Sequence, residues 1–399
     1  MKKINFTVPF IFLCAGLFNF VFADSKIQFE FKQKKGDSVV HIATVNEEAY
    51  LNNRLVNKIE FINRIATTVL EKDKDGKALL ETHYMTTEKR QGTTLEWKQE
   101  ESTVQTYRTK NGEIIDPDNE FMPTVRNVPC FPDYKVAPGD SWQADGMEVH
   151  DLCELFNMSR AIKIPFTANY TYIGDEENLN VIECYYEIFQ DAQQDSYYRG
   201  SLYAGAEGYA KQKIFWDQKK GDLDHYTEEF QIQMYDVYGN SYTFISEAEG
   251  KVTEYHSVND DENLKKIEKS IKKMKLDDVS VQKSEKGLTI SIENIQFEAD
   301  SDKLRASEKT KLRKIADLLK EYNNDLLITG HCAERGTVNA RQKLSESRAE
   351  AVADYLQILG VRDEYHIFTQ GKGSTEPIAS NETEAGRAKN RRVEITIMD

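Results

Sequence analysis

Apolar and polar residues alternate along much of the chain between residues 24 and 256. Ile27, Phe29 and Phe31 are separated by polar residues, and the runs 181–189 and 232–238 repeat the pattern. Clusters typical of tight turns, such as Lys110-Asn111-Gly112, interrupt these runs at short intervals. Because successive side chains of a strand point to opposite faces, the pattern predicts antiparallel strands that each bury one face. We therefore expect a β-rich region, built as an antiparallel sandwich or an open, barrel-like sheet.

Two stretches leave the internal organisation of this region open. The run Val45–Arg64 also has apolar residues three or four positions apart, which suits a helix equally well. A proline-rich stretch from Pro117 to Pro138 favours a long connection. We use it to divide the region into two predicted β-rich modules, residues 24–130 and 131–257. Charged residues occur on both faces of most predicted strands, which leaves no lipid-facing band, so the region is expected to be water-soluble.

The last third of the chain alternates helical and strand patterns. Residues 260–276 predict an amphipathic helix without the aromatic anchor of a membrane-surface helix, so packing on a neighbouring domain is favoured, and residues 258–283 are assigned as a helical linker. The segment 284–399 then predicts a two-layer α/β domain with the order β-α-β-α-β-β. Its expected strands lie near 288–292, 326–329, 366–370 and 393–397, and its helices near 304–322 and 339–359.

One residue of the second of these helices is unusual for a core stripe. Arg348 lies one turn after Leu344 and one turn before Val352, on a face that is otherwise mostly apolar. Such a guanidinium either reaches solvent along its stem, pairs with a structural carboxylate, or binds an anion. The periodicity alone leaves these alternatives open.

Several motifs of residues 284–399 resemble the OmpA-like C-terminal family, which includes the peptidoglycan-associated lipoproteins and the periplasmic part of flagellar stator proteins. The matching positions are Ile295-Gln296-Phe297-Glu298, Leu304, Thr329-Gly330-His331, Gly336, Leu344-Ser345, Arg348-Ala349, Gly371, Gly373, Pro377, Asn381, Arg387 and Asn390-Arg391-Arg392-Val393-Glu394. The resemblance implies a domain that binds the peptide stem of peptidoglycan without covalent chemistry. It does not extend to residues 24–256.

The resemblance also implies how the ligand is bound. In the family, an Asp that follows Gly-His-x takes the ammonium of meso-diaminopimelate, and the helix Arg takes its carboxylate through a bidentate fork. Arg348 matches this Arg. By the same resemblance, His331, Asn390, Arg391 and Arg392 are expected at the ligand site.

Two positions depart from the family pattern. Ala333 occupies the place of the Asp, and Arg341 the place of an Asn that often stands three residues before the helix Leu, here Leu344. A hydrogen bond to a charged group is worth about 1.5–3 kcal/mol, so the missing Asp is expected to weaken binding roughly 10- to 150-fold. Glu334 is a candidate replacement, although adjacent residues of a strand point in different directions.

The beginning of the chain predicts export. Lys2 and Lys3 precede an apolar run, and Ala23 is the small residue expected before cleavage, so residues 1–23 are a predicted signal peptide. The mature protein is then expected in the periplasm, with association to the outer membrane left open. Cys14 would allow a lipid tether, but Leu13 stands where a small residue is usual.

Four cysteines follow this segment: Cys130, Cys153, Cys184 and Cys332. They are too few for a disulfide-built scaffold, which leaves free thiols or one bridge among the first three as alternatives.

The formal charge of −15 is concentrated in the first part of the chain, since residues 284–399 contain 18 Lys and Arg against 20 Asp and Glu. An acidic β-rich region disfavours nucleic acid as a partner and leaves envelope proteins as candidates.

The sequence does not favour catalysis. Asp73-x-Asp75-Gly76 resembles part of a calcium loop but has Thr82 at its closing position, and the segment His150–Glu154 has no partner motif for a metal. No nucleophile with an adjacent base and no phosphate loop emerges, so we expect no metal, no cofactor and no enzyme activity. The leading hypothesis is a cell-envelope protein that associates with peptidoglycan. The alternative is a degenerate domain that serves as a structural or protein-interaction module.

Overall fold

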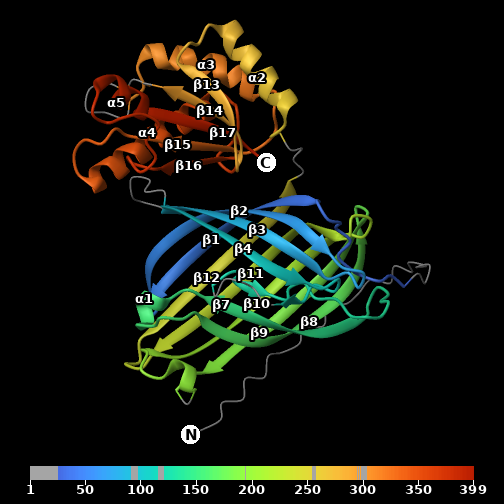
Figure 1. The fold of residues 1–399 in the computed structure, drawn as a ribbon. Helices are drawn as coiled ribbons and strands as arrows, with labels where there is room; N and C mark the ends of the chain where they lie inside the picture. The colour runs from blue at the N-terminus through green and yellow to red at the C-terminus, as the bar shows by residue number, and fades with distance from the viewer. Residues whose placement is uncertain are drawn as a thin grey trace.

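The computed structural model describes residues 26–90, 98–115, 121–193, 195–253, 258–293, 295, 297 and 303–399. A β-rich unit is followed by an α/β domain that lies on one side of it (Figure 1). The predicted signal peptide 1–23, Cys14, and the motif residues Gln296 and Glu298 lie outside the described residues.

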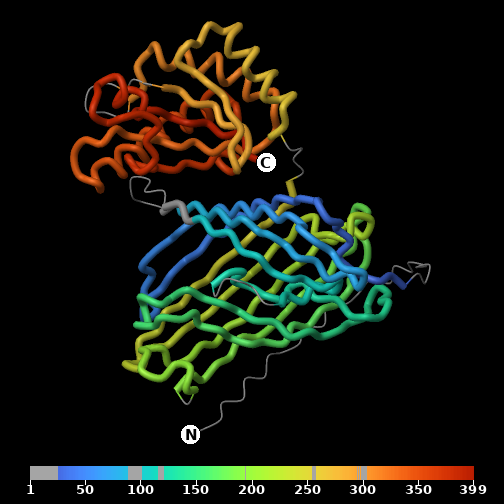
Figure 2. Tube along the Cα trace, in the orientation of Figure 1, coloured from blue at the N-terminus to red at the C-terminus, as the bar shows by residue number. Residues whose placement is uncertain are grey.

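One twelve-stranded sheet makes up the β-rich unit. Its order is β5-β4-β3-β2-β1-β12-β11-β10-β9-β8-β7-β6, and all of its pairs are antiparallel. The first strand pairs with the last, so the sheet curls into a nearly closed barrel whose margins are the two-residue strands β5 and β6 (Figures 1 and 2). The strands are β1 Ser38–Leu51, β2 Arg54–Lys72, β3 Ala78–Arg90, β4 Lys98–Arg108, β5 Ile114–Ile115, β6 Val125–Arg126, β7 Ser141–His150, β8 Ile162–Glu176, β9 Leu179–Asp191, β10 Tyr203–Asp217, β11 Asp222–Asp236 and β12 Ser241–Thr253.

This sheet revises two expectations. The segments 24–130 and 131–257 share one sheet rather than forming two separate modules, because β1 pairs with β12 from Val40 to Leu51. The ambiguous run Val45–Arg64 forms strands, not a helix. Asn52 and Asn53 have φ values of 50° and 64° between β1 and β2, the backbone of a two-residue hairpin turn.

Aromatic side chains pack at both ends of the barrel-like sheet. Near the end of β10, Trp216 contacts Phe31 edge to face with 5.0 Å between ring centroids. At the beginning of the same strand, Tyr203 contacts Phe156 of the short helix α1 (Cys153–Phe156) at 5.3 Å. The 3-10 helix η1 (Ser196–Tyr198) adds Tyr198 to this second cluster, 5.0 Å from Tyr203. Both clusters belong to one apolar core of the barrel-like sheet.

The C-terminal domain has a five-stranded sheet with the order β13-β14-β17-β15-β16. One face of the sheet packs against α2, α3 and α4 in a single apolar core. The elements are α2 Asp261–Met274, β13 Val279–Ser284, β14 Gly287–Glu293, α3 Ala306–Leu319, β15 Leu326–Gly330, α4 Val338–Ile358, β16 Ile367–Gly371, α5 Glu384–Asn390 and β17 Arg392–Met398. The predicted two-layer α/β architecture is confirmed.

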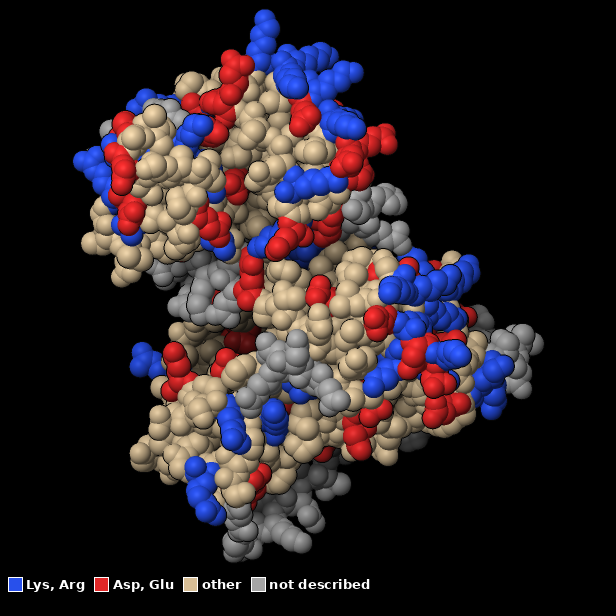
Figure 3. Space-filling model, in the orientation of Figure 1, with Lys and Arg blue, Asp and Glu red and all other residues tan. Residues whose placement is uncertain are grey.

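The segment 258–283 is part of this domain and not a linker. Ile267 and Ile271 of α2 are buried in the domain core, and β13 is the edge strand of its sheet. The lysines of α2 point outward, and Figure 3 shows them gathered over this helix, whereas charges of both signs are scattered elsewhere on the same face. None of the helices in the described ranges is long and apolar enough to cross a membrane.

The free face of the C-terminal sheet lies on the outer face of β1, β2 and β3. Leu327, Phe368 and Met398 pack there against a small apolar cluster of the barrel-like sheet. The members of that cluster are Val40, Ile42, Ile62 and Met85, with Ala66 at its edge. The C-terminal sheet is therefore covered by helices on one side and by the barrel-like sheet on the other.

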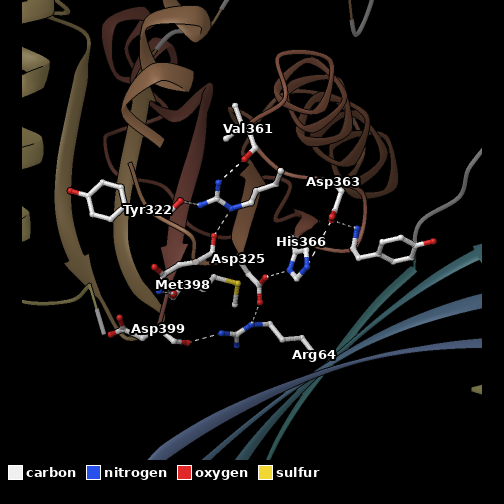
Figure 4. Close-up of polar contacts among 11 residues, drawn as sticks. Arg64, Tyr322, Asp325, Val361, Asp363, His366, Met398 and Asp399 are labelled. Carbon is white, nitrogen blue, oxygen red and sulfur yellow. Dashed lines mark hydrogen bonds and ion pairs between the residues drawn. The ribbon is translucent and has the colours of Figure 1, made fainter. Parts of the chain in front are cut away.

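A buried ion pair joins the two units beside this cluster (Figure 4). The Nε of Arg64 in β2 donates to Oδ2 of Asp325 at 2.8 Å, and the two side chains are 4% and 0% exposed. Arg64 also donates to the backbone carbonyl of Asp399 at 2.6 Å. The other oxygen of Asp325 lies 2.7 Å from Nδ1 of His366. Polar and apolar contacts thus fix the same face of the domain.

Candidate ligand site at the end of strand β15

Close packing of α4 on β15 and β16 positions the candidate site. A Cβ atom at Gly330 would lie 2.0 Å from the carbonyl oxygen of Ser345, and one at Gly371 would lie 2.6 Å from the Ser345 hydroxyl. Both glycines therefore allow the strands to approach the helix. The helix begins at Val338 after Thr337, whose hydroxyl accepts a hydrogen bond from the amide of Ala340.

Arg348 projects from α4 toward the chain that follows β15. Its guanidinium carbon lies 4.9 Å from the ring centroid of Phe297, in the geometry of a cation–π contact. Its Nε is buried without a hydrogen-bond partner among the described residues. No described carboxylate lies within ion-pair distance of the guanidinium. Arg348 is thus a partly buried cation that lacks a counterion within the described part of the chain.

The charged side chains around Arg348 are cations. Burial lowers the pKa of Arg348, and the nearby charge of Arg391 lowers it further, whereas Cys332 raises it. The Cys332 thiol is itself buried, which raises its pKa, while Arg348 and Arg341 lower it. The structure therefore brings Arg348, Arg391, Arg341 and Cys332 together. Such a group of cations around a neutral thiol favours an anion.

The two departures from the family pattern lie beside this group. Ala333 is buried and offers only a methyl group to the site. Glu334 is exposed, and its amide donates to Oδ1 of Asn381 at 3.1 Å. Arg341 donates to the carbonyl of Gly336 at 2.7 Å, and its Nε is buried without a partner in the described ranges. Ala333, the position at which the resemblance implies an Asp, therefore provides no side-chain acceptor.

His331 and Arg392 lie in the framework behind the site. Both are almost fully buried, and both are next to Glu394: Nε2 of His331 lies 3.5 Å from one carboxylate oxygen, and Nε of Arg392 lies 2.7 Å from the other. Burial alone would raise the pKa of Glu394, but the hydrogen bonds and charges of His331 and Arg392 lower it to about 2. Glu394 therefore stays ionised and holds both side chains in place.

Asn390 and Arg391 close the other side of the site. Asn390 is buried, and its Oδ1 accepts from the amides of Ile378 and Ala379, so it fixes the loop before α5. Arg391 pairs with Glu384 at 2.8 Å. Among the residues expected at the site, Arg348 and Arg391 thus lie together, while His331, Asn390 and Arg392 lie in the supporting framework.

Three contributors were not identified as site residues from the sequence. Phe297 lies under the Arg348 guanidinium, Glu384 holds Arg391, and Glu394 holds His331 and Arg392. Phe297 and Glu394 belong to the family motifs, so the motif was an available signal. Nothing in the sequence pointed to Glu384 except its spacing of three from Arg387, with which it also pairs at 2.9 Å.

The described residues contain neither a disulfide bond nor a group arranged to hold a metal ion. Cys130, Cys153, Cys184 and Cys332 are all free of disulfide bonds. Within the described ranges, no three His, Cys, Asp or Glu side chains are arranged to hold a metal ion.

Comparison with known proteins identifies relatives of this domain. Residues 296–391 match the OmpA family, and the match does not extend into the β-rich unit. A probable lipoprotein of Escherichia coli, YiaD, is 38% identical over 127 residues, which are 31% of this chain and 58% of YiaD. The peptidoglycan-binding protein ArfA of Mycobacterium tuberculosis is 43% identical over 104 residues, which are 26% of this chain and 32% of ArfA. The chain thus spans less than two thirds of either relative.

Among solved structures, the peptidoglycan-associated lipoprotein of Burkholderia pseudomallei is 32% identical. The alignment covers 27% of this chain and 87% of that one, with a TM-score of 0.24.

Proposed function

Because residues 296–391 form an OmpA-family domain, we propose that this chain is a non-catalytic cell-envelope protein whose C-terminal domain binds the peptide stem of peptidoglycan. The named relatives include a peptidoglycan-binding protein and lipoproteins. The proposal places the mature protein in the periplasm. It leaves the β-rich unit, whose sequence is acidic overall, for contacts with other envelope proteins.

The observation that carries the proposal is the partly buried guanidinium of Arg348 without a described counterion. Holding a desolvated cation without a partner is unfavourable, and a ligand carboxylate removes this cost while accepting two parallel hydrogen bonds. The charge of Arg391 strengthens the attraction for an anion. Arg348 is therefore assigned to the free carboxylate of a diamino acid in the stem peptide.

The ammonium of that diamino acid has no equivalent partner in the proposed complex. Ala333 provides none, and Glu334 is exposed and one residue away. We therefore expect binding that rests mainly on Arg348 and is weaker than in a domain with an acidic residue at position 333. Because the side chain of Ala333 is only a methyl group, it is also consistent with the alternative function, a structural module that no longer binds this ligand.

Cosedimentation of the full mature chain with purified sacculi tests the proposal. Arg348→Ala is expected to weaken binding at least about tenfold, because it removes a bidentate charged contact. The matched control is Arg313→Ala, since Arg313 is an exposed arginine of α3 and should leave binding unchanged. Ala333→Asp is expected to strengthen binding roughly 10- to 150-fold by supplying the missing acceptor.

The two functions predict different results. Measurable binding that Arg348→Ala abolishes supports the proposed function. If the parent chain does not bind sacculi and Ala333→Asp does, the parent domain is the structural module of the alternative. Binding that is insensitive to both substitutions would contradict the role of Arg348.

A further inference from the structure

The inner face of the barrel-like sheet can be followed across its strands by register. Val45 of β1 lies opposite Ala248 of β12, Ala248 opposite Glu228 of β11, and Glu228 opposite Gln212 of β10. Next to this row, Ile65 of β2 lies opposite Tyr84 of β3. The alternate residues of β2, such as Arg64, point outward to the C-terminal domain.

Side chains fill this interior unevenly. On β8 and β9, the inward residues Ile164, Ile182 and Tyr186 are completely buried. On β1 to β3, the inward Val45, Ile65 and Tyr84 remain partly exposed, although they face the inside of the sheet. A cavity of about 680 Å³ accounts for this difference, and its volume is in the range of small-molecule sites. Its apolar wall includes Val45, Ile65, Val125, Val128, Ile214 and Leu223.

The cavity reaches the seam where the sheet is not closed. The margins of the sheet are β5 and β6. Ser102 of β4, on one side of the seam, and Thr124 and Val125, on the other, all line the cavity. The cavity therefore extends to the region between the two margins of the sheet.

Glu228 of β11 presents its carboxyl group to the cavity, which Asp151 also lines. Its Oε1 accepts a hydrogen bond from Gln212 at 2.6 Å, and Gln212 is its sole hydrogen-bond partner among the described residues. Burial raises the pKa of Glu228. Glu148 lies close enough for the charge of Glu228 to add to the effect of burial, which raises the Glu148 pKa to about 8. The Glu148 carboxyl accepts from Tyr186 at 2.6 Å. Nε2 of His150 lies 3.4 Å from the other oxygen of Glu148, but burial lowers the pKa of His150 to about 4, so its ring is neutral at neutral pH. Among the described residues, Glu228 has no ion-pair partner.

The one cationic residue on the cavity wall is already engaged. Arg64 is the only Lys or Arg among the described lining residues, and its guanidinium binds Asp325 and Asp399 on the far side of the sheet. The described lining is therefore apolar with acidic groups, and none of its residues offers an unengaged Lys or Arg to a carboxylate ligand.

We propose that this cavity binds an amphiphilic amine, with its apolar body against Val45, Ile65 and Ile214 and its ammonium group at the carboxylate of Glu228. An ammonium supplies the missing counterion and donates charged hydrogen bonds, worth about 1.5–3 kcal/mol, whereas the hydroxyl of an alcohol gains only about 1 kcal/mol. A fatty carboxylate would place like charges together. This site is separate from the peptidoglycan site and does not depend on it.

Titration calorimetry of the full mature chain with dodecylamine, dodecanol and dodecanoate, each below its micelle concentration, tests the inference. We expect one dodecylamine to bind per chain, roughly tenfold more tightly than dodecanol, with dodecanoate weakest. Glu228→Gln should abolish the preference for amine over alcohol while alcohol binding persists. Ile65→Trp should fill the cavity and weaken binding of all three probes.

The matched control is Glu229→Gln. Glu229 lies next to Glu228 on the outer face of β11, where it pairs with Lys211 at 3.4 Å, and its replacement should leave binding unchanged. Retention of the native far-UV circular dichroism spectrum confirms that each variant is folded. The inference is overturned if dodecanoate binds as tightly as dodecylamine, or if neither Glu228→Gln nor Ile65→Trp alters amine binding.

Discussion

At the scale of single residues, Arg348 of the C-terminal domain and Glu228 of the barrel-like sheet have a common property. Each is a group removed from bulk water that lacks an opposite charge among the described residues. Removing a charged or titratable group from water without a partner is costly, and such groups are concentrated at functional sites. We therefore expect an anion at the first residue and a cation at the second.

Glu394 provides a pH-dependent test of the framework behind the Arg348 site. Its pKa is lowered to about 2 in the folded protein, against an ordinary value near 4.3 in the unfolded chain. A lowered pKa stabilises the fold above the unfolded value, and this contribution is lost as the pH falls from about 4 toward 2. Glu394→Gln should therefore destabilise the protein at neutral pH and make its stability less sensitive to acid.

Urea unfolding at a series of acidic pH values measures this effect. The parent and Glu394→Gln should converge in stability as the pH falls. Parallel curves with a constant difference would show that the carboxylate charge is not what stabilises His331 and Arg392.

At the scale of secondary structure elements, the pair Arg64–Asp325 joins β2 to the beginning of β15. Removing one partner of a buried ion pair leaves the other charge without compensation, which costs about 3–5 kcal/mol. Because His366 still contacts Asp325, we expect Arg64→Ala to destabilise the protein by about 3 kcal/mol, at the lower end of this range. Arg54→Ala, an exposed arginine at the start of the same strand, is the control and should change stability little.

Chemical denaturation followed by tryptophan fluorescence measures the difference. Equal stabilities of the Arg64→Ala and Arg54→Ala variants would mean that the pair does not stabilise the contact between the units.

His366 makes the stability of the contact between the two units depend on pH, in the direction opposite to that expected for Glu394. Its hydrogen bond to Asp325 raises its pKa, an effect that burial opposes and the charge of Asp363 supports, while Arg362 lowers it. A raised histidine pKa stabilises the fold below the unfolded value of about 6.5, and this stabilisation is lost as the pH rises through the folded value. His366→Gln should therefore lower the melting temperature at weakly acidic pH and have less effect at alkaline pH. A pH-independent difference in melting temperature would contradict the charge-based explanation.

The sequence predicted the elements better than their assembly. Alternation of apolar and polar residues was sufficient for the strands, since each has one buried face. It was insufficient for Val45–Arg64, because Ile62 and Arg64 face the C-terminal domain while Phe61 and Ile65 face inward, so both faces carry apolar residues. The pair Asn52-Asn53 was the local turn signal that could have resolved this ambiguity.

The ligand site shows the same limit. Arg348 could be found from its place in a helical stripe, and the family resemblance suggested a ligand for it. Whether Arg348 has a counterion depends on side chains that several elements bring together, so no local sequence pattern can predict it. The pairing of Arg64 with Asp325, 261 positions apart, likewise arises only when the two units meet.

At the scale of the whole molecule, the C-terminal sheet has no solvent-facing side over Leu327, Phe368 and Met398, because the barrel-like sheet covers them. A fragment of residues 258–399 would expose these side chains as one apolar patch, and such patches promote association. We expect this fragment to self-associate in size-exclusion chromatography, and Phe368→Ser in the fragment to reduce association. A monomeric fragment would indicate that the patch is too small to drive self-contact.

The contact between the two units also determines how the molecule would carry mechanical load. A pull on the cell-wall ligand would act first on α4, which holds Arg348, and on β15, which begins directly after Asp325. The adjoining strands would pass that force sideways into β1, β2 and β3 through the buried face, before the covalent connection between β12 and α2 came under tension. The packed face would then resist the force in shear. The load would be distributed over many side-chain contacts and would not fall on the backbone between β12 and α2 alone.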